Sequence, residues 1–422
     1  MSNSNNKAKN LTSAGGMVTT GGALARKFFA IGPEKFRRAF ESRMVRGSLI
    51  LTYPNGRKQI IKGSKKGPNA RIDVLRWRAM QRLLLGGTVG GAKGFILGEW
   101  TSPDLVAVVE LFAVNQKTFE KGFRGTRWLK TMNRLKHKFQ ANSKKGSRKN
   151  IQFHYDLGND FYEAWLDPSM TYSSAVFEKS DNSLEVAQKQ KYRKLLKLLQ
   201  VRPGERILEI GCGWGGFAET AAREFEASVT GITLSREQLK YSQKRMKKAG
   251  LEDKVNIRFE DYRDVKETFD HVVSIEMFEA VGEDYWPDYF SKIHQVLKPG
   301  GKAALQIITI DDDVFETYRK DVDFIQTYIF PGGMLPSMAA LHDQVAKSGL
   351  TWGKAKTYGN HYAKTLKEWR KRFEKAYQGD RLPKGFDETF RRTWNYYMAY
   401  CEGGFRGKTI NVVQLQLIKN LK

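Results

Sequence analysis

Cysteine is scarce in this chain of 422 residues, in which Cys212 and Cys401 are the only two. Two thiols give no disulfide framework, and we expect a protein of a reducing cytoplasm. The six histidines are scattered, and no Cys/His spacing typical of a zinc site occurs. The sequence therefore argues against a disulfide-stapled or zinc-organised fold, and we expect no metal site.

Long apolar runs are also missing. No stretch of about 18 apolar residues occurs, so no membrane-spanning helix is expected. Residues 1–22 are rich in Ser, Asn, Thr and Gly, which predicts disorder, and they show no pattern of a secretory signal. The dinucleotide loop G-x-G-x-x-G and the phosphate loop G-x-x-x-x-G-K-[ST] are absent as well.

Acidic residues are few relative to basic ones: 45 Asp and Glu stand against 72 Lys and Arg, a net charge of +27. Such an excess predicts an anionic partner, either nucleic acid or an acidic membrane surface. No zinc finger, RNA-binding aromatic signature or helix-turn-helix pattern is present, so we expect no specific nucleic-acid partner. Residues 23–42 mix phenylalanines with basic residues, which suits a helix on anionic lipid or packing on a core equally well.

The chain is organised around Arg206 to Phe217, RILEIGCGWGGF, where an apolar strand turns through four glycines into a helix. Glycine is required where a chain turns tightly and passes close to a ligand. Strand patterns recur with helical patterns between them, which predicts a doubly wound, Rossmann-like α/β sheet with its ligand at the carboxyl ends of the strands. The expected strands are 207–210, 227–233, 255–259, 269–275 and 302–310, and the expected helices are 184–200, 236–249 and 285–297.

The length indicates two domains. A small α+β domain is expected over 23–120, with a hairpin of 47–53 and 58–62, a helix over 105–114, and either a helix or a strand and helix over 72–85. Residues 121–149 read as a basic linker. The larger domain is expected over 150–422.

Several motifs together resemble the cyclopropane-fatty-acid synthase family, which includes the mycolic-acid cyclopropane synthases. They are EIGCGWGG (209–216), GITLSREQ (231–238), SIEMFEAVG (274–282), FHYDLGNDFYEAWLDPSMTYSSAVFE (153–178), YIFPGGMLPS (328–337), HYAKTLKEW (361–369) and CEGGFRGKTINVVQLQL (401–417). The resemblance implies a class I methyltransferase domain that uses S-adenosylmethionine and acts on lipid double bonds.

The cofactor site follows from the resemblance and from the strand ends. Gly211, Gly213 and Gly215 would admit the methionine and ribose, while Asp261 and Tyr262 would meet the adenine. Tyr262 stands where the family more often has Trp. The remaining cofactor residues that we expect from the family motifs are Tyr172, Ser173, Glu209, Thr233, Leu234, Gln238 and Ile275.

The resemblance also implies a catalytic group. Glu279 matches the family glutamate that orients a bound bicarbonate, and Tyr362 matches a tyrosine at the same anion. Glu276 competes with Glu279 as the carboxylate at the strand end. Cys401 matches a cysteine once assigned as catalytic, although methyl transfer to an alkene needs no thiolate and packing explains it as well.

Three positions depart from the family pattern: Ser174 replaces Cys, Gln306 replaces His, and Ala280 replaces His. Ser174 and Gln306 can still donate hydrogen bonds, so whether bicarbonate binds as a second ligand stays open.

The expected reaction is methyl transfer to the double bond of an unsaturated phospholipid acyl chain, giving a cyclopropane. A methylene- or methyl-branched product, a methyltransferase for another substrate class, and a lipid-binding protein without activity are the alternatives. We expect an anionic membrane surface as partner and a cytoplasmic protein on the inner face of the membrane; a homodimer is left open.

Overall fold

The computed structural model describes residues 38, 40–120 and 157–421, which form two compact units. The first unit comprises the described part of Met1–Phe139 with Glu316–Pro331 and Lys384–Thr409. The second comprises the described part of Gln140–Phe315 with Gly332–Pro383 and Ile410–Lys422. Two segments of the predicted larger domain, Glu316–Pro331 and Lys384–Thr409, therefore belong to the first unit. The predicted disordered segment 1–22, most of 23–42 and the predicted linker 121–149 lie outside the described residues.

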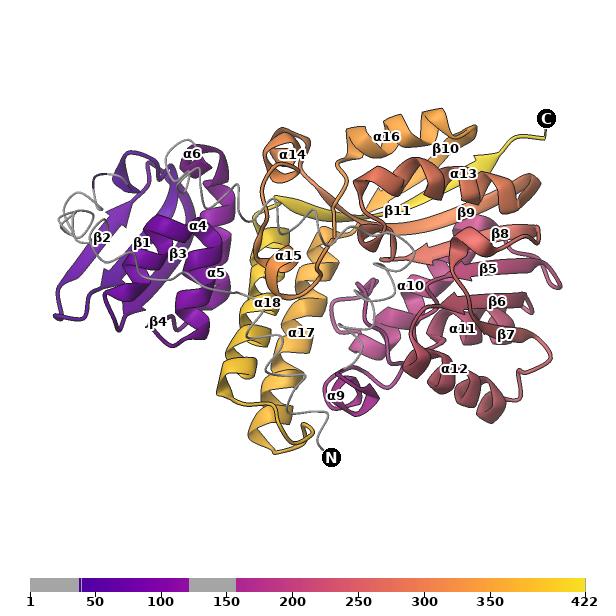
Figure 1. The fold of residues 1–422 in the computed structure, drawn as a ribbon, viewed down its shortest axis with the longest axis horizontal. Helices are drawn as coiled ribbons and strands as arrows, with labels where there is room; N and C mark the ends of the chain where they lie inside the picture. Colours follow the sequence, from indigo (N-terminus) through magenta and orange to yellow (C-terminus); the bar gives the residue numbers. More distant parts are fainter. Residues whose placement is uncertain (1–37, 39, 121–156, 422) are drawn as a thin grey trace. The chain divides into compact units, whose positions relative to one another are not determined.

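The first unit contains a four-stranded sheet in the order β2-β1-β3-β4 (Figure 1). Its strands are β1 (Arg46–Thr52), β2 (Lys58–Lys62), β3 (Lys65–Val74) and β4 (Trp100–Thr101). The predicted hairpin is confirmed, because β1 pairs antiparallel with β2 and Ile50 lies opposite Ile60. Alternate residues such as Leu49, Leu51 and Ile61 are buried, as expected for a sheet with one face on a core.

Helices of the first unit pack together around this core. They are α4 (Arg78–Ile96), α5 (Leu105–Val114), α6 (Gln116–Glu120), α15 (Phe324–Tyr328) and α18 (Glu388–Arg406). The open question over 72–85 is resolved as the end of a strand followed by a helix. Phe40 is buried and its ring contacts Phe112 and Phe119, so this phenylalanine packs on the core. A Cβ on Gly403 would lie 2.6 Å from Cβ of Val109, which explains a glycine where α18 meets α5.

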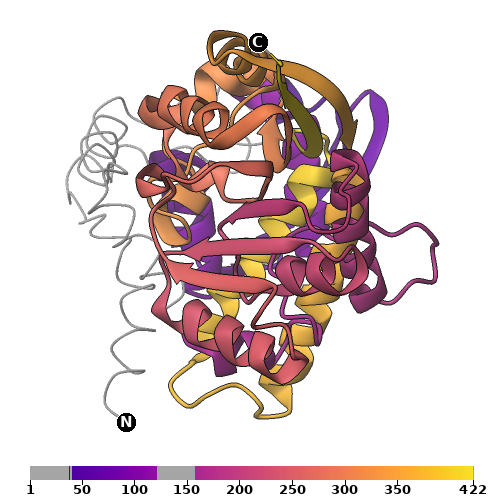
Figure 2. The same cartoon turned by 90° about the vertical axis from the view of Figure 1, so that its right-hand side faces the viewer.

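The second unit is built on a seven-stranded mixed sheet in the order β10-β11-β9-β8-β5-β6-β7. The strands β5 (Arg206–Ile210), β6 (Ser228–Thr233), β7 (Val255–Phe259), β8 (Phe269–Ile275) and β9 (Leu297–Ile310) are parallel and confirm the five predicted strands. The exception is the start of β9, which lies five residues before the predicted start at 302. Two further strands, β10 (Leu350–Thr357) and β11 (Ile410–Lys419), were not predicted and run antiparallel at one edge. Figure 2 shows this sheet from another side; its parallel strands with intervening helices confirm the predicted doubly wound α/β architecture.

Helices cover both faces of this sheet. They include α9 (Asn159–Glu163), α10 (Leu184–Leu199), α11 (Gly216–Glu224), α12 (Arg236–Ala249), α13 (Trp286–Val296), α16 (Met338–Lys347) and α17 (Gly359–Gln378), and α14 (Asp312–Tyr318) follows β9. Three of them, α10, α12 and α13, confirm the predicted helices to within one residue at each end. Ser183 and Ser235 begin α10 and α12 by accepting from the backbone N–H three residues on. Within the described residues, no helix is long and apolar enough to cross a bilayer.

Candidate active site

The predicted glycine turn lies between β5 and α11. Gly211, Gly213 and Gly215 have φ of +83°, +53° and +83°, conformations that side chains with a Cβ rarely adopt. A Cβ on Gly211 would lie 2.9 Å from Cγ of Met277, and one on Gly215 would meet α12. A Cβ on Gly213 would meet no atom within 4 Å, because this residue borders a cavity. The turn therefore leaves open space beside its backbone.

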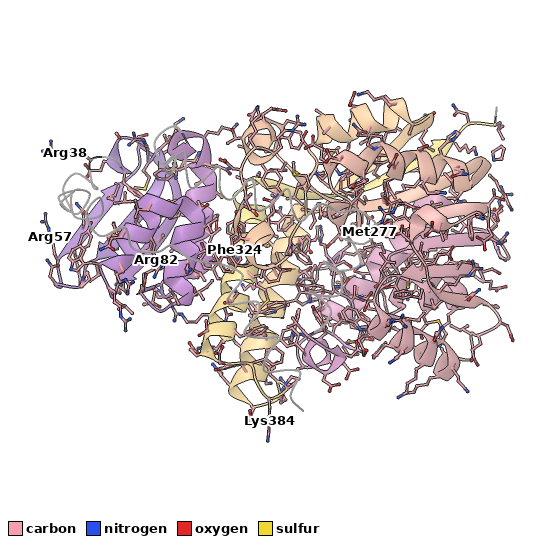
Figure 3. The ribbon with its side chains drawn as sticks, viewed as in Figure 1. Arg38, Arg57, Arg82, Met277, Phe324 and Lys384 are labelled. Atoms are coloured by element: carbon pink, nitrogen blue, oxygen red, sulfur yellow. The ribbon has the colours of Figure 1, made fainter. Side chains whose placement is uncertain are left out.

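That cavity has a volume of about 150 Å³ and lies at the carboxyl ends of the parallel strands, beside Met277 (labelled in Figure 3). Most of the predicted cofactor residues line it: Tyr172, Ser173, Glu209, Gly211, Gly213, Thr233, Leu234, Gln238, Tyr262 and Ile275. Gly215 and Asp261 do not. Residues that we did not predict, among them Met170, Trp214, Glu260 and Met277, also line it.

Two buried polar atoms on the cavity wall are available to a ligand. Thr233 Oγ1 donates to Gln238 Oε1 at 2.9 Å, which leaves the Gln238 Nε2 group as a donor without a partner among the described residues. Glu209 Oε2 likewise has no hydrogen-bond partner in that part of the chain. Burial raises the pKa of Glu209 to about 8. Buried polar groups are normally satisfied, so these two atoms fit a polar ligand such as the cofactor.

Of the two residues after β7 that we expected to meet the adenine, Tyr262 lines the cavity and Asp261 does not. Asp261 is buried, and its carboxylate accepts from Arg263 Nε at 2.8 Å and from Nη2 at 2.7 Å, so it fixes the following 3-10 turn. The neighbouring Glu260 lines the cavity instead. Tyr262 lines it too, and its ring packs edge-on against Tyr289.

Glu276 directly follows β8, and three of the expected catalytic residues donate hydrogen bonds to its carboxylate. Its Oε2 accepts from the Tyr362 hydroxyl at 2.6 Å, and its Oε1 accepts from the Ser174 amide at 2.8 Å and from Gln306 Nε2 at 2.7 Å. Gln414 Nε2 donates to Gln306 Oε1 at 2.9 Å, which fixes the amide that faces Glu276. Glu276 lines the cavity and has φ of +51°, which is strained for a residue with a side chain. Burial raises the pKa of its carboxyl, and the Tyr362 hydrogen bond opposes this shift.

Glu279 lies in the short 3-10 turn Phe278–Ala280 and has a different environment. Its Oε1 accepts from the Ile308 amide at 2.5 Å, and its buried Oε2 has no partner within the described ranges. Burial, followed by repulsion from Glu276, raises the pKa of Glu279 to about 8. This carboxyl is therefore largely protonated at neutral pH. Tyr362, Gln306 and Ser174, which we expected near Glu279, donate to Glu276 instead.

Two other expected residues take different roles. The Ser174 hydroxyl donates to the carbonyl of Ala175 at 3.1 Å, so the Ser174 backbone amide, and not its hydroxyl, reaches the carboxylate. Cys401 lies on α18 of the first unit, whereas the residues that line the cavity all belong to the second unit.

A buried lysine that the sequence analysis missed supports the segment next to Ser174. Lys191 on α10 is fully buried, and its Nζ donates to Ser173 Oγ at 2.5 Å. On the same helix, Gln188 Nε2 donates to the Ser173 carbonyl at 2.9 Å. Burial lowers the pKa of Lys191 to about 7, opposed first by the charge of Glu276. Together these two side chains fix the segment that presents the Ser174 amide.

An aromatic cluster stands behind Tyr172 on the cavity wall. The Tyr172 ring lies 5.2 Å from that of Trp369 and 5.4 Å from that of Tyr162, measured between centroids. Tyr162 in turn lies 5.1 Å from Trp214. Among the described residues, no group of three or more His, Cys, Asp or Glu side chains could hold a metal ion.

Comparison with known proteins identifies the family. The profile of a family described as mycolic acid cyclopropane synthetase matches residues 142–415. Tuberculostearic acid methyltransferase UfaA1 of Mycobacterium tuberculosis is 38% identical over 342 residues, 79% of each chain. The cyclopropane-fatty-acyl-phospholipid synthase of Escherichia coli K12 is 38% identical over 265 residues, 62% of this chain and 65% of that protein.

Solved structures agree. The cyclopropane synthase MmaA2 of Mycobacterium tuberculosis superimposes with a TM-score of 0.60 at 32% identity, covering 64% of this chain and 98% of that one. The mycolic acid cyclopropane synthase CmaA1, solved with SAH and CTAB, gives a TM-score of 0.59 at 32% identity and the same coverage. The chain therefore belongs to the mycolic acid cyclopropane synthetase family and is an S-adenosylmethionine-dependent methyltransferase of the fatty-acid-modifying kind.

Proposed function

We propose that this enzyme methylates the double bond of an unsaturated acyl chain of a membrane phospholipid and closes a cyclopropane, with Glu276 as the proton acceptor. The supporting observation is that three donors, from Tyr362, Gln306 and the Ser174 amide, hold one carboxylate at the cavity wall. An E. coli relative named for the phospholipid reaction supports the substrate class.

The cofactor residues are part of this proposal. Gly211 and Gly213 let the ligand approach the backbone, and Tyr262 offers a ring. Glu209 and Gln238 each offer a buried polar atom that has no partner in the part of the chain that the structure describes. When bound, S-adenosylmethionine supplies an electrophilic methyl group. SAH in the CmaA1 structure supports the same cofactor here.

The reaction needs a group that accepts a proton, and the carboxylate of Glu276 can do so. Addition of a methyl group to an alkene leaves a positive charge on the neighbouring chain carbon, so the site must exclude water and remove a proton. Loss of a proton from the added methyl gives its C–H electrons to the ring bond, and the carboxylate of Glu276 takes the proton. The Tyr172 ring and the rings behind it exclude water, and a desolvated ring stabilises a nearby cation by about 2 kcal/mol.

An internal carboxylate makes a bound bicarbonate unnecessary. Glu276 already occupies the donors that an anion would require, and a second anion beside it would be repelled. We therefore expect turnover in carbonate-free buffer to equal turnover with added bicarbonate. A loss of activity that bicarbonate restores would contradict this assignment.

Glu276→Gln tests the base directly. We expect kcat to fall at least about a hundredfold, as for loss of a general base, while SAH affinity stays within about threefold. Glu279→Gln is the matched control, because glutamine mimics a protonated carboxyl, and we expect it to keep at least about a tenth of kcat. Equal losses in both variants would remove the distinction between the two glutamates.

A methylene- or methyl-branched product is the second candidate. It is favoured by UfaA1, which is named for tuberculostearic acid and aligns with 79% of this chain. The same Glu276 would then take a proton after the charge has moved along the chain, leaving an olefin. Both products add one CH2 unit, so proton NMR of the extracted methyl esters decides: cyclopropyl protons support the first candidate and vinylic protons the second.

A further inference from the structure

One face of the first unit's sheet carries an exposed apolar pair. Ile50 on β1 lies opposite Ile60 on β2, and the two side chains are 37% and 56% exposed. Their neighbours along the strands, Leu49, Leu51 and Ile61, are buried on the opposite face. Because side chains alternate along a strand, the isoleucines belong to the face that points away from the core.

Cations surround this pair. Lys58 and Lys62 lie on either side of Ile60 along β2, and Arg71 of β3 lies opposite Ile50. The sequence over residues 46–74 contains seven Lys and Arg and a single acid, Asp73, which pairs with Arg71 at 3.0 Å. Arg57, labelled in Figure 3, lies in the turn that joins β1 to β2. The face is thus apolar at its centre and cationic around it.

Protection of a free sheet edge explains only part of this pattern. Lysines on an edge strand such as β2 discourage pairing with another chain. They do not explain an isoleucine between them that is more than half exposed, since a polar residue would protect the edge better. An apolar centre with a cationic rim matches the surface of an anionic bilayer, where phosphates meet the start of the acyl chains.

We propose that this outward face, formed by Ile50, Lys58, Ile60, Lys62 and Arg71, docks the enzyme on an anionic phospholipid bilayer. The inference rests on the proposed function, in which the acyl substrate belongs to a membrane phospholipid. It assigns membrane contact to the β1–β3 sheet, which is separate from the residues of the methyl-transfer cavity.

The test is co-sedimentation of the full chain with vesicles of phosphatidylglycerol and phosphatidylcholine. Each lysine at an anionic surface strengthens binding by a factor of about five, so K58Q/K62Q should bind about thirtyfold more weakly. The matched control K240Q/K244Q removes the same charge from exposed positions on α12 and should change binding less than about threefold. Equal weakening by both pairs would mean that net charge alone acts, and would overturn the assignment.

The apolar centre has its own test. Ile60→Ser should weaken vesicle binding about fivefold, whereas Val186→Ser at a similarly exposed position of α10 should have no effect. Methyl transfer to detergent-dispersed lipid should be unchanged in all four variants, which separates loss of docking from failure of the proposed function. If K58Q/K62Q instead alters self-association or RNA binding while vesicle binding is kept, the face serves another partner and the proposal fails.

Discussion

The hydroxyl of Tyr362 donates to Glu276 Oε2 at 2.6 Å and joins α17 to the end of β8. These residues are 86 positions apart, and the bond sets the orientation of the carboxylate that faces the cavity. It also favours the ionised form of Glu276, because a donor to a carboxylate stabilises its charge. Tyr362 therefore controls both the position and the protonation of the proposed base.

Tyr362→Phe should lower kcat about tenfold or more at neutral pH and shift the acid limb of the pH profile upward. Loss of the donor raises the pKa of Glu276 further, so a larger share of the enzyme is protonated and inactive at low pH. Tyr358→Phe, at the start of the same helix, is the control and should keep the wild-type profile. A uniform loss of activity at every pH would argue for a structural role alone.

Gly213→Val should abolish SAH binding in a folded protein. The new side chain would enter the open space beside the turn, which is the proposed path of the cofactor. Gly250→Val is a stringent control, since Gly250 also has a positive φ of +65° and open surroundings but caps the far end of α12. We expect similar losses of Tm in both variants from backbone strain, and loss of SAH binding by calorimetry only in Gly213→Val.

The sequence predicted the parallel half of the large sheet well, because each strand is a short apolar run followed by turn residues. The antiparallel edge was not predicted. β10, LTWGKAKT, is largely exposed and lacks a clear apolar alternation, and β11 pairs with it from about 60 residues away. Pairing over such a distance depends on the assembled sheet and leaves little local signal.

The proposed catalytic group could be predicted only in part. Motifs identified Tyr362, Gln306 and Ser174, but only the fold shows that they meet at Glu276. Two residues separate Glu276 from Glu279, and the turn between them decides which glutamate faces the donors. Lys191 did have a signal in the sequence. It occupies the buried stripe of α10 with Leu184, Leu195 and Leu199, where an unpaired lysine is rare.

Lys191→Met should make activity more sensitive to acid. The buried ammonium stabilises the carboxylates of Glu276 and Glu209, so its removal raises the pKa of both. Turnover should therefore fall more at pH 6 than at pH 9. Lys189→Met on the exposed side of α10 removes a lysine paired with Glu185 and should leave the profile unchanged. A profile of unchanged shape in Lys191→Met would show that the lysine only supports packing.

Glu279→Gln should change how stability depends on pH. The folded state holds the proton of Glu279 up to about pH 8, whereas an unfolded glutamate loses it near its ordinary pKa of 4.5. The group therefore contributes stability that is fully present below pH 4.5 and is lost as the pH rises toward 8. Glutamine keeps the neutral shape without titrating, so the Tm of the variant should fall less than that of the wild type between pH 5 and pH 8.

Glu368→Gln, on the exposed surface of α17, serves as the control and should follow the wild-type curve. Parallel curves for Glu279→Gln and the wild type would mean that Glu279 is ionised in the folded protein, and would return it to consideration as the base.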